Sequence, residues 1–268
     1  MAAQASTSGG LLFEVDGAVA TITLNRPHVG NALDIPMSRE LMELAIRCEG
    51  DAAIRCVVLG GAGKLFCGGG DVAAFAAAGD DLPDFLREIT SYLHQAIAVF
   101  ARMDKPLVTA VNGSAAGAGI GLAILGDVVL AEPTASFSLA YTGIGLTPDG
   151  GTTWLLPRLI GLRRAQELCL TNRKVRAEEA VSLGLVTRLV EAGTLAAETK
   201  TLADTLARSA TAALGATRKM LVESYSNTLE SQLALESRTI SNQSRNYEGR
   251  EGVTAFLEKR APRFLKED

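Results

Sequence analysis

Two buried strands of this chain each lead into a glycine-rich turn, and this repeated pattern constrains the fold more than any other feature. Arg55–Leu59 runs into Gly60–Gly63, and Leu107–Val111 ends in a second run with three glycines, Asn112–Gly119. Each turn is followed by residues suited to a helix. A strand, turn and helix repeated in this way predict an α/β fold, in which ligands collect at the carboxyl ends of the strands.

The segments before and between these strands carry local signals. Leu11–Val15 and Ala18–Leu24 alternate around Asp16-Gly17, which predicts a β-hairpin. Asp34 is a good N-cap for a helix over the residues that follow it, 35–49. A long amphipathic helix is predicted over 84–102, and the stretch before it, 73–83, has the composition of a mobile segment.

The chain changes character beyond Glu191. This part is rich in Ala and Leu and poor in strand-forming residues, so helices are predicted over 194–208, 211–224 and 228–247. We therefore expect three regions: a flexible tail over 1–10, a core over 11–192, and a helical C-terminal domain over 193–268.

Composition excludes several classes of protein. A net charge of −4 over 268 residues gives no basic surface for nucleic acid. Four cysteines without CxxC spacing and only two histidines predict no metal site. Without an apolar run of about 18 residues, no membrane span is expected. The first residues lack the charge and apolar run of a signal peptide. A soluble, cytoplasmic protein is the expectation.

The glycine-rich turns can bind an anion or an oxyanion, because free N–H groups and the helix dipole point into such turns. A tight connection without ligand is the alternative for either turn taken alone. The P-loop pattern is missing, since no Gly-Lys-Ser/Thr ends either run. The dinucleotide pattern also fits poorly, because no acidic residue ends a later strand at the expected distance. Two such turns suit a thioester enolate, whose single charged oxygen two converging N–H groups can stabilise.

A series of motifs resembles the enoyl-CoA hydratase/isomerase (crotonase-like) family, in order, from about residue 12 to 264. The motifs are Phe66-Cys-Gly-Gly-Gly-Asp71, Lys105-Pro-Leu-Val-Thr-Ala-Val-Asn-Gly113, Ala116-Gly-Ala-Gly119, Gly143-Ile-Gly-Leu-Thr-Pro-Asp-Gly-Gly-Thr152, Ala177-Glu-Glu-Ala-Val-Ser-Leu-Gly-Leu-Val186 and Glu251-Gly-Val-Thr-Ala-Phe-Leu-Glu-Lys-Arg260. The resemblance implies a crotonase-like spiral of ββα units, a C-terminal helical trimerisation domain, and a homotrimer or dimer of trimers. It also implies an acyl-CoA thioester as substrate and no further cofactor.

The resemblance assigns roles to residues of these motifs. Gly70 and Ala118 would supply the oxyanion-binding N–H groups; relatives usually carry Gly at the second position, so Ala118 requires a negative φ. The remaining expected substrate and CoA contacts are Gly68, Asp71, Val72, Tyr141, Phe256 and Lys259. Phe256 and Lys259 would reach the CoA of a neighbouring subunit, with Lys259 as a phosphate partner.

The reaction depends on acidic residues. By the resemblance, Gly121 and Tyr141 occupy the positions of the two glutamates with which hydratases of the family act, so simple hydration is disfavoured. Asp149 instead aligns with the acidic residue of isomerases acting on ring-epoxide phenylacetyl-CoA and unsaturated acyl-CoA thioesters. We therefore expect an isomerase with Asp149 as acid and base. Asp149 is expected near apolar side chains such as Trp154, and the apolar residues Phe75, Leu82 and Phe85 are expected to form the acyl pocket.

Three alternatives stay open. The chain partly resembles 4-chlorobenzoyl-CoA dehalogenases, in which Asp149 would be the nucleophile and His94 the general base. It could be an enoyl-CoA hydratase, as the family name suggests. It could also be a non-catalytic acyl-CoA binder, or a relative that binds RNA, which the acidic charge disfavours.

Overall fold

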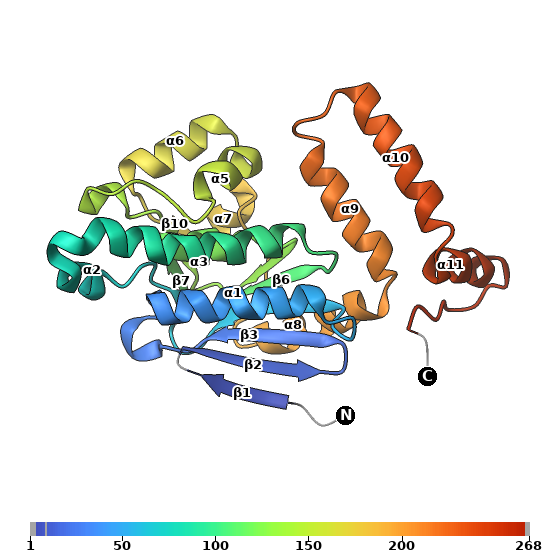
Figure 1. Cartoon of the computed structure of the whole chain (residues 1–268), viewed down its shortest axis with the longest axis horizontal. Helices are drawn as coiled ribbons and strands as arrows, with labels where there is room; N and C mark the ends of the chain where they lie inside the picture. The colour runs from blue at the N-terminus through green and yellow to red at the C-terminus, as the bar shows by residue number, and fades with distance from the viewer. Residues whose placement is uncertain (1–3, 9, 266–268) are drawn as a thin grey trace.

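Two hydrogen-bonded sheets form the frame of the molecule in the computed structural model, which describes residues 4–8 and 10–265 (Figure 1). The first sheet has the order β1 (Gln4–Ser8), β2 (Leu11–Asp16), β3 (Val19–Leu24), β4 (Cys56–Gly61), β6 (Leu107–Val111), β8 (Val128–Ala131), β11 (Arg188–Leu189). The second has the order β10 (Val175–Arg176), β9 (Ser136–Ser138), β7 (Ser114–Ala116), β5 (Leu65–Cys67). In the first sheet, the pairings β3–β4, β4–β6, β6–β8 and β8–β11 are all parallel. This confirms the α/β prediction.

The predicted hairpin is present, with Leu11 paired to Leu24 and Asp16 to Val19. Gly17, in the turn, has a φ of 59°, a left-handed conformation that favours glycine. The prediction of a flexible tail over 1–10 is wrong for part of its length, because Gln4–Ser8 forms β1 and pairs with β2. The open edge of β2 offers unpaired backbone groups that this strand can satisfy. Residues 1–3 and 9 lie outside the described chain.

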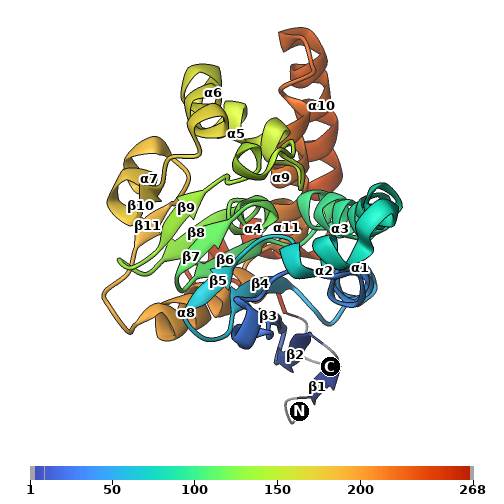
Figure 2. The same ribbon diagram turned by 90° about the vertical axis from the view of Figure 1, so that its left-hand side faces the viewer.

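Helices cover both faces of the first sheet (Figure 2). On one side, α1 (Ile35–Gly50) packs along α3 (Leu82–Arg102). On the other side, α8 (Leu195–Arg208) packs Ala203 and Ala207 against Val58 and Val108 of β4 and β6. The other helices of the core are α4 (Ala118–Ala123), α5 (Thr152–Ile160), α6 (Leu162–Thr171) and α7 (Ala177–Leu183).

A short helix replaces the mobile segment predicted before α3. Val72–Ala78 forms α2, and Gly79–Asp81 continues as a turn of 3₁₀ helix. Asp71 is the N-cap of α2, accepting a hydrogen bond from the N–H of Ala74 at 3.2 Å. This cap, together with the high helix propensity of the five alanines in α2, explains why the segment is ordered locally.

Beyond α8 the chain forms α9 (Thr211–Glu223), α10 (Leu229–Gln243) and α11 (Tyr247–Leu257). The helical character predicted for the C-terminal region is confirmed. α9 and α10 run side by side and project away from the sheets (Figure 1). Their apolar side chains include many that no other part of the described chain covers. Over the described residues, no helix combines the length and apolar character needed to cross a membrane.

Candidate active site

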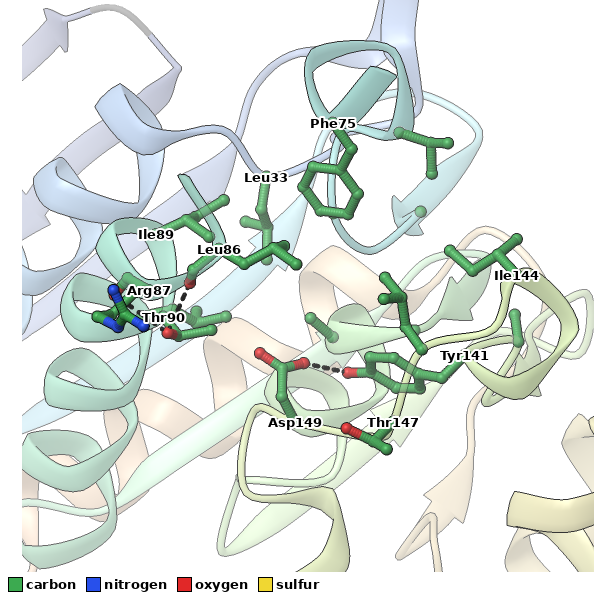
Figure 3. A pocket seen from close by; sticks show the side chains of 18 residues that line it. Leu33, Phe75, Leu86, Arg87, Ile89, Thr90, Tyr141, Ile144, Thr147 and Asp149 are labelled. Atoms are coloured by element: carbon green, nitrogen blue, oxygen red, sulfur yellow. Dashed lines mark hydrogen bonds between the residues drawn. The ribbon is translucent and has the colours of Figure 1, made fainter. Parts of the chain in front are cut away.

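A cavity of about 390 Å³ opens where the glycine-rich turn after β5, the N-terminus of α4 and the loop before α5 meet α3 (Figure 3). Its α3 wall carries Leu86, Ile89 and Leu93, and Phe75 of α2 points in beside Leu86, across from Tyr141 and Asp149. Most of the lining is therefore apolar, with few polar groups, as is usual for sites that bind small molecules. Of the three residues expected in the acyl pocket, Phe75 lies on its wall, whereas Leu82 and Phe85, at the start of α3, do not line it.

The glycines after β5, Gly68–Gly70, touch the turn before α4, Ala116–Gly117, at this cavity. Gly69 has a φ of 94°, and a Cβ added to it would lie 2.8 Å from the carbonyl oxygen of Ala116. The neighbouring residues Gly70 and Ala118 both line the cavity, as does Gly68. Their close backbone approach thus brings two turns that are 48 residues apart in the sequence to one place.

The backbone donors at Gly70 and Ala118 are free. In the described part of the chain, neither N–H donates to a backbone or side-chain acceptor. Ala118 is the first residue of α4, so its N–H has no partner within its own helix. Ala118 is not among the residues with positive φ, so the side chain that replaces the usual glycine causes no backbone strain. The arrangement can accept an oxyanion.

Asp149 lies in the loop before α5 and supplies the carboxylate on the wall of this cavity, where it is joined by no other acidic residue of the described chain. The hydroxyl of Tyr141 donates to Asp149 Oδ1 at 2.5 Å (Figure 3). Burial, and then the nearby Asp149 charge, raise the pKa of Tyr141. The phenol therefore keeps its proton, and it donates to the carboxylate.

His94 approaches Asp149 from α3. Its Nε2 atom lies 3.3 Å from Asp149 Oδ2 and accepts a hydrogen bond from the N–H of Gly150 at 3.2 Å. The same ring nitrogen thus faces both groups, and it accepts from Gly150 in the tautomer that carries its proton on Nδ1. His94 and Asp149 are 55 residues apart, and no local sequence signal links them.

Gly121 lies behind the cavity wall and does not line it. A Cβ added there would overlap the carbonyl oxygen of Gly150. This backbone arrangement leaves no room for a side chain at residue 121. Tyr141 fills the other position that the resemblance assigns to a hydratase glutamate. A carboxylate could occupy position 121 only if the turn at Gly150 moved.

The other predicted contacts fall into two groups. Val72 lines the cavity, whereas Asp71 does not: its carboxylate caps α2 and lies 3.2 Å from Arg26. Phe256 and Lys259 belong to α11 and the residues after it, are exposed, and do not line the cavity. A contact with the CoA of another subunit stays a prediction for these two residues.

The prediction for Trp154 is wrong. Its side chain does not line the cavity that holds Asp149, but lies over a different one, where Arg158 stacks on it at 4.1 Å. α5 begins three residues after Asp149, and its first turn carries Trp154 away from the carboxylate. The sequence pointed to the first turn of α3 through Leu82 and Phe85, whereas the wall is formed further along this helix by Leu86, Ile89 and Leu93.

Comparisons with known proteins identify a family, related sequences and similar structures. The sequence model of a family described as Enoyl-CoA hydratase/isomerase matches residues 14–267. A Rhodobacter capsulatus protein named "Probable enoyl-CoA hydratase" is 43% identical, over 94% of this chain and 96% of its own. The 1,2-epoxyphenylacetyl-CoA isomerase of Escherichia coli is 39% identical, over 95% of this chain and 97% of its own.

Two further similarities concern the fold and the alternative reaction, dehalogenation. The crystal structure of an enoyl-CoA hydratase from Polaromonas sp. superposes with a TM-score of 0.90 at 34% identity, over 95% of this chain and 99% of the other. It confirms the crotonase-like architecture expected from the motifs. A 4-chlorobenzoyl coenzyme A dehalogenase from Arthrobacter sp. is 33% identical, over 80% of this chain and 78% of its own.

Proposed function

Because this chain belongs to the enoyl-CoA hydratase/isomerase family, we propose that it is an acyl-CoA isomerase that uses Asp149 as acid and base. The substrate is an unsaturated or aromatic-derived acyl-CoA thioester. The observation that carries the proposal is the position of Asp149, the carboxylate of a cavity that is also lined by Gly70 and Ala118, whose N–H groups donate to no acceptor of the described chain. The family assignment alone does not distinguish isomerisation from hydration.

The geometry supports a simple sequence of proton transfers. The N–H groups of Gly70 and Ala118 donate to the thioester oxygen, and the Asp149 carboxylate removes a proton from one carbon of the acyl group. The resulting dienolate carries its charge on the oxygen between the two donors. The Asp149 carboxyl group then returns the proton to another carbon, so the double bond moves with no net gain or loss of atoms. Tyr141 holds the carboxylate in place between the two steps.

Hydration needs more from the site than isomerisation does. Water must be activated by one group while another protonates Cα, and the two positions considered for glutamates hold Gly121 and Tyr141. The buried phenol is a poor base, since its raised pKa keeps it protonated. The site therefore supports isomerisation better than hydration, although the Rhodobacter relative carries the hydratase name.

Dehalogenation is a second candidate, and the 3.3 Å contact between His94 and Asp149 favours it. In that reaction an Asp149 oxygen attacks the ring carbon that bears the halogen, and halide leaves. Water then hydrolyses the aryl ester, giving its proton to His94. The test is His94→Gln with a halobenzoyl-CoA: a covalent aryl-enzyme trapped at Asp149 would establish this reaction and contradict the isomerase proposal.

The proposal extends to assembly. Exposed apolar side chains gather on the last two helices, namely Leu229, Leu233, Ile240, Val253, Phe256 and Leu257. In a homotrimer or dimer of trimers these faces become buried, and Phe256 and Lys259 come within reach of CoA bound to a neighbour. A monomer leaves them in water, which is costly for contiguous apolar surface.

A panel of thioesters tests the reaction class. The purified protein is incubated in deuterated water with 2-enoyl-, 3-enoyl- and halobenzoyl-CoA, and the products are identified by mass spectrometry and NMR. We expect shifted double bonds in the enoyl products and no gain of water. A hydroxyacyl product identifies a hydratase, halide release a dehalogenase, and binding without any reaction a non-catalytic acyl-CoA binder.

A further inference from the structure

A second cavity, also of about 390 Å³, lies beside the first and has no role in the mechanism above. Ile97 and Ala101 of α3 form one wall, and Trp154 and Leu155 of α5 form another. Ala98, Leu125 and Val222 add to the apolar lining, and its polar side chains are His94 and Arg102, both exposed. A site with such walls suits an apolar ligand, because burying apolar surface is favourable and water still reaches the two polar side chains.

The two cavities follow one another along the same side of α3. Leu86, Ile89 and Leu93 line the first cavity, while Ile97 and Ala101 line the second. These positions are three or four residues apart, so they form one continuous helical face. At about 1.5 Å per residue, the face from Leu86 to Ala101 extends for about 22 Å. The cavities are therefore two compartments along one helix rather than unrelated hollows.

The contact between His94 and Asp149 divides the two compartments. Asp149 lines the first and His94 lines the second, and their side chains meet at 3.3 Å. Two residues beyond Asp149, Gly151 already lines the second compartment. The divide is thin and movable, since the His94 side chain is 49% exposed and can turn toward water.

We propose that the second compartment holds the distal part of a long apolar acyl chain, with His94 as the residue that sets how far the chain can extend. The inference rests on the proposed function, which places the reacting carbons of the thioester beside Asp149. From there a short acyl group ends within the first compartment. A longer one must pass the divide, displace the His94 ring, and continue between Ile97 and Leu155.

Binding of saturated acyl-CoA thioesters with 4 to 14 carbons tests this assignment, measured by calorimetry below their micelle concentrations. Each methylene that enters the second compartment strengthens binding, by up to about fourfold. Ala98 is exposed and lines this compartment, so Ala98→Trp fills it without disturbing the core. We expect this variant to lose at least about tenfold of the ratio between long-chain and short-chain affinity.

Gln95→Trp is the matched control, because it places the same side chain on an exposed position of α3 that lines neither cavity. It should keep the wild-type ratio. His94→Ala removes the divide and should raise the ratio. The inference is wrong if affinity stops rising at a length that the first compartment alone accommodates and Ala98→Trp leaves the ratio unchanged. A neighbouring copy that covers the second compartment would give that result.

Failure of this inference is separable from failure of the proposed function. Saturated thioesters have no double bond to move, so their binding does not depend on the isomerase reaction. A chain-length ratio that Ala98→Trp does not change, in a protein that still isomerises enoyl-CoA, contradicts only the second compartment. An intact ratio in a protein without isomerase activity contradicts only the reaction.

Discussion

Ala118 stands at the first position of α4 and lines the cavity, and its N–H donates to no acceptor of the described chain. Proline is tolerated best at this position of a helix, because its ring replaces an N–H that the helix does not use. Ala118→Pro therefore removes the proposed oxyanion donor with little effect on the helix. We expect kcat to fall by about 10²–10³, the usual loss for one such donor.

Ala118→Val is the control for this variant, since valine adds a similar volume and keeps the N–H. It should retain most of the activity that Ala118→Pro loses, with both variants compared by single-turnover kinetics and by thermal unfolding. Equal loss in both would show that space, and not the donor, is what matters at residue 118. Gly70→Pro is a poorer test, because a side chain there would meet the ring of Phe75.

Some residues of this site were predictable from the sequence, and some of their contacts were not. The positions of Gly68, Gly70, Val72, Ala118, Tyr141 and Asp149 on one cavity agree with the assignments made from the motifs. The hydrogen bond from Tyr141 to Asp149 and the position of Trp154 could not be predicted. Both depend on how the loop between β9 and α5 turns, which involves left-handed glycines at 145, 150 and 151.

Among the elements, α2 has the clearest dependence on one side chain. Asp71 caps this helix and lies 3.2 Å from Arg26, with both side chains largely buried. Asp71→Ala should lower the free energy of unfolding by about 1–2 kcal/mol, mainly through the lost cap. Because α2 carries Val72 and Phe75 on the cavity wall, KM should rise more than kcat falls. Urea unfolding and steady-state kinetics measure the two effects.

Asp71→Asn separates the cap from the charge. Asparagine can still accept from the N–H of Ala74, so most of the stability should return, while the ion pair with Arg26 is lost. If both variants unfold like the wild type, the cap does not hold α2 in place. If Asp71→Asn abolishes thioester binding although it keeps the cap, the carboxylate itself takes part in CoA recognition, as the motif suggested.

Elements with a strong local signal were predictable, and those formed by partners distant in sequence were not. The hairpin has its Asp-Gly turn, and α1 has Asp34, which accepts from the N–H of Met37 at 2.9 Å. By contrast, β1 exists through its pairing with β2. The run of alanines in α2 has the composition of a mobile segment, whereas in the structure the cap at Asp71 begins a helix there.

For the whole molecule, the proposed assembly makes the next prediction. Light scattering at micromolar concentration should give a mass three or six times 28.1 kDa. Leu233→Glu with Ile240→Glu places two charges on exposed apolar positions of α10 and should dissociate the assembly. A wild-type protein that stays monomeric would contradict the assembly and leave Lys259 without a route to CoA.

The overall architecture was predictable from the order of motifs along the chain, whereas the connection between the two compartments was not. Strands and glycine turns are local patterns, and a parallel sheet brings their ends together in a known way. The second compartment instead requires α3, α5 and α9 to meet, from parts of the chain more than 50 residues apart. Such packing follows from side-chain fit, which no sequence period reveals.

The rate of double-bond shift in Asp149→Asn tests the central claim most directly. The substrate is the enoyl-CoA that the wild type converts fastest, and calorimetry confirms that the variant still binds it. Asparagine keeps the shape and can still meet the Tyr141 hydroxyl, but it cannot take a proton. We predict a loss of at least about 10² in kcat with little change in affinity. An Asp149→Asn variant that isomerises at the wild-type rate would contradict the account.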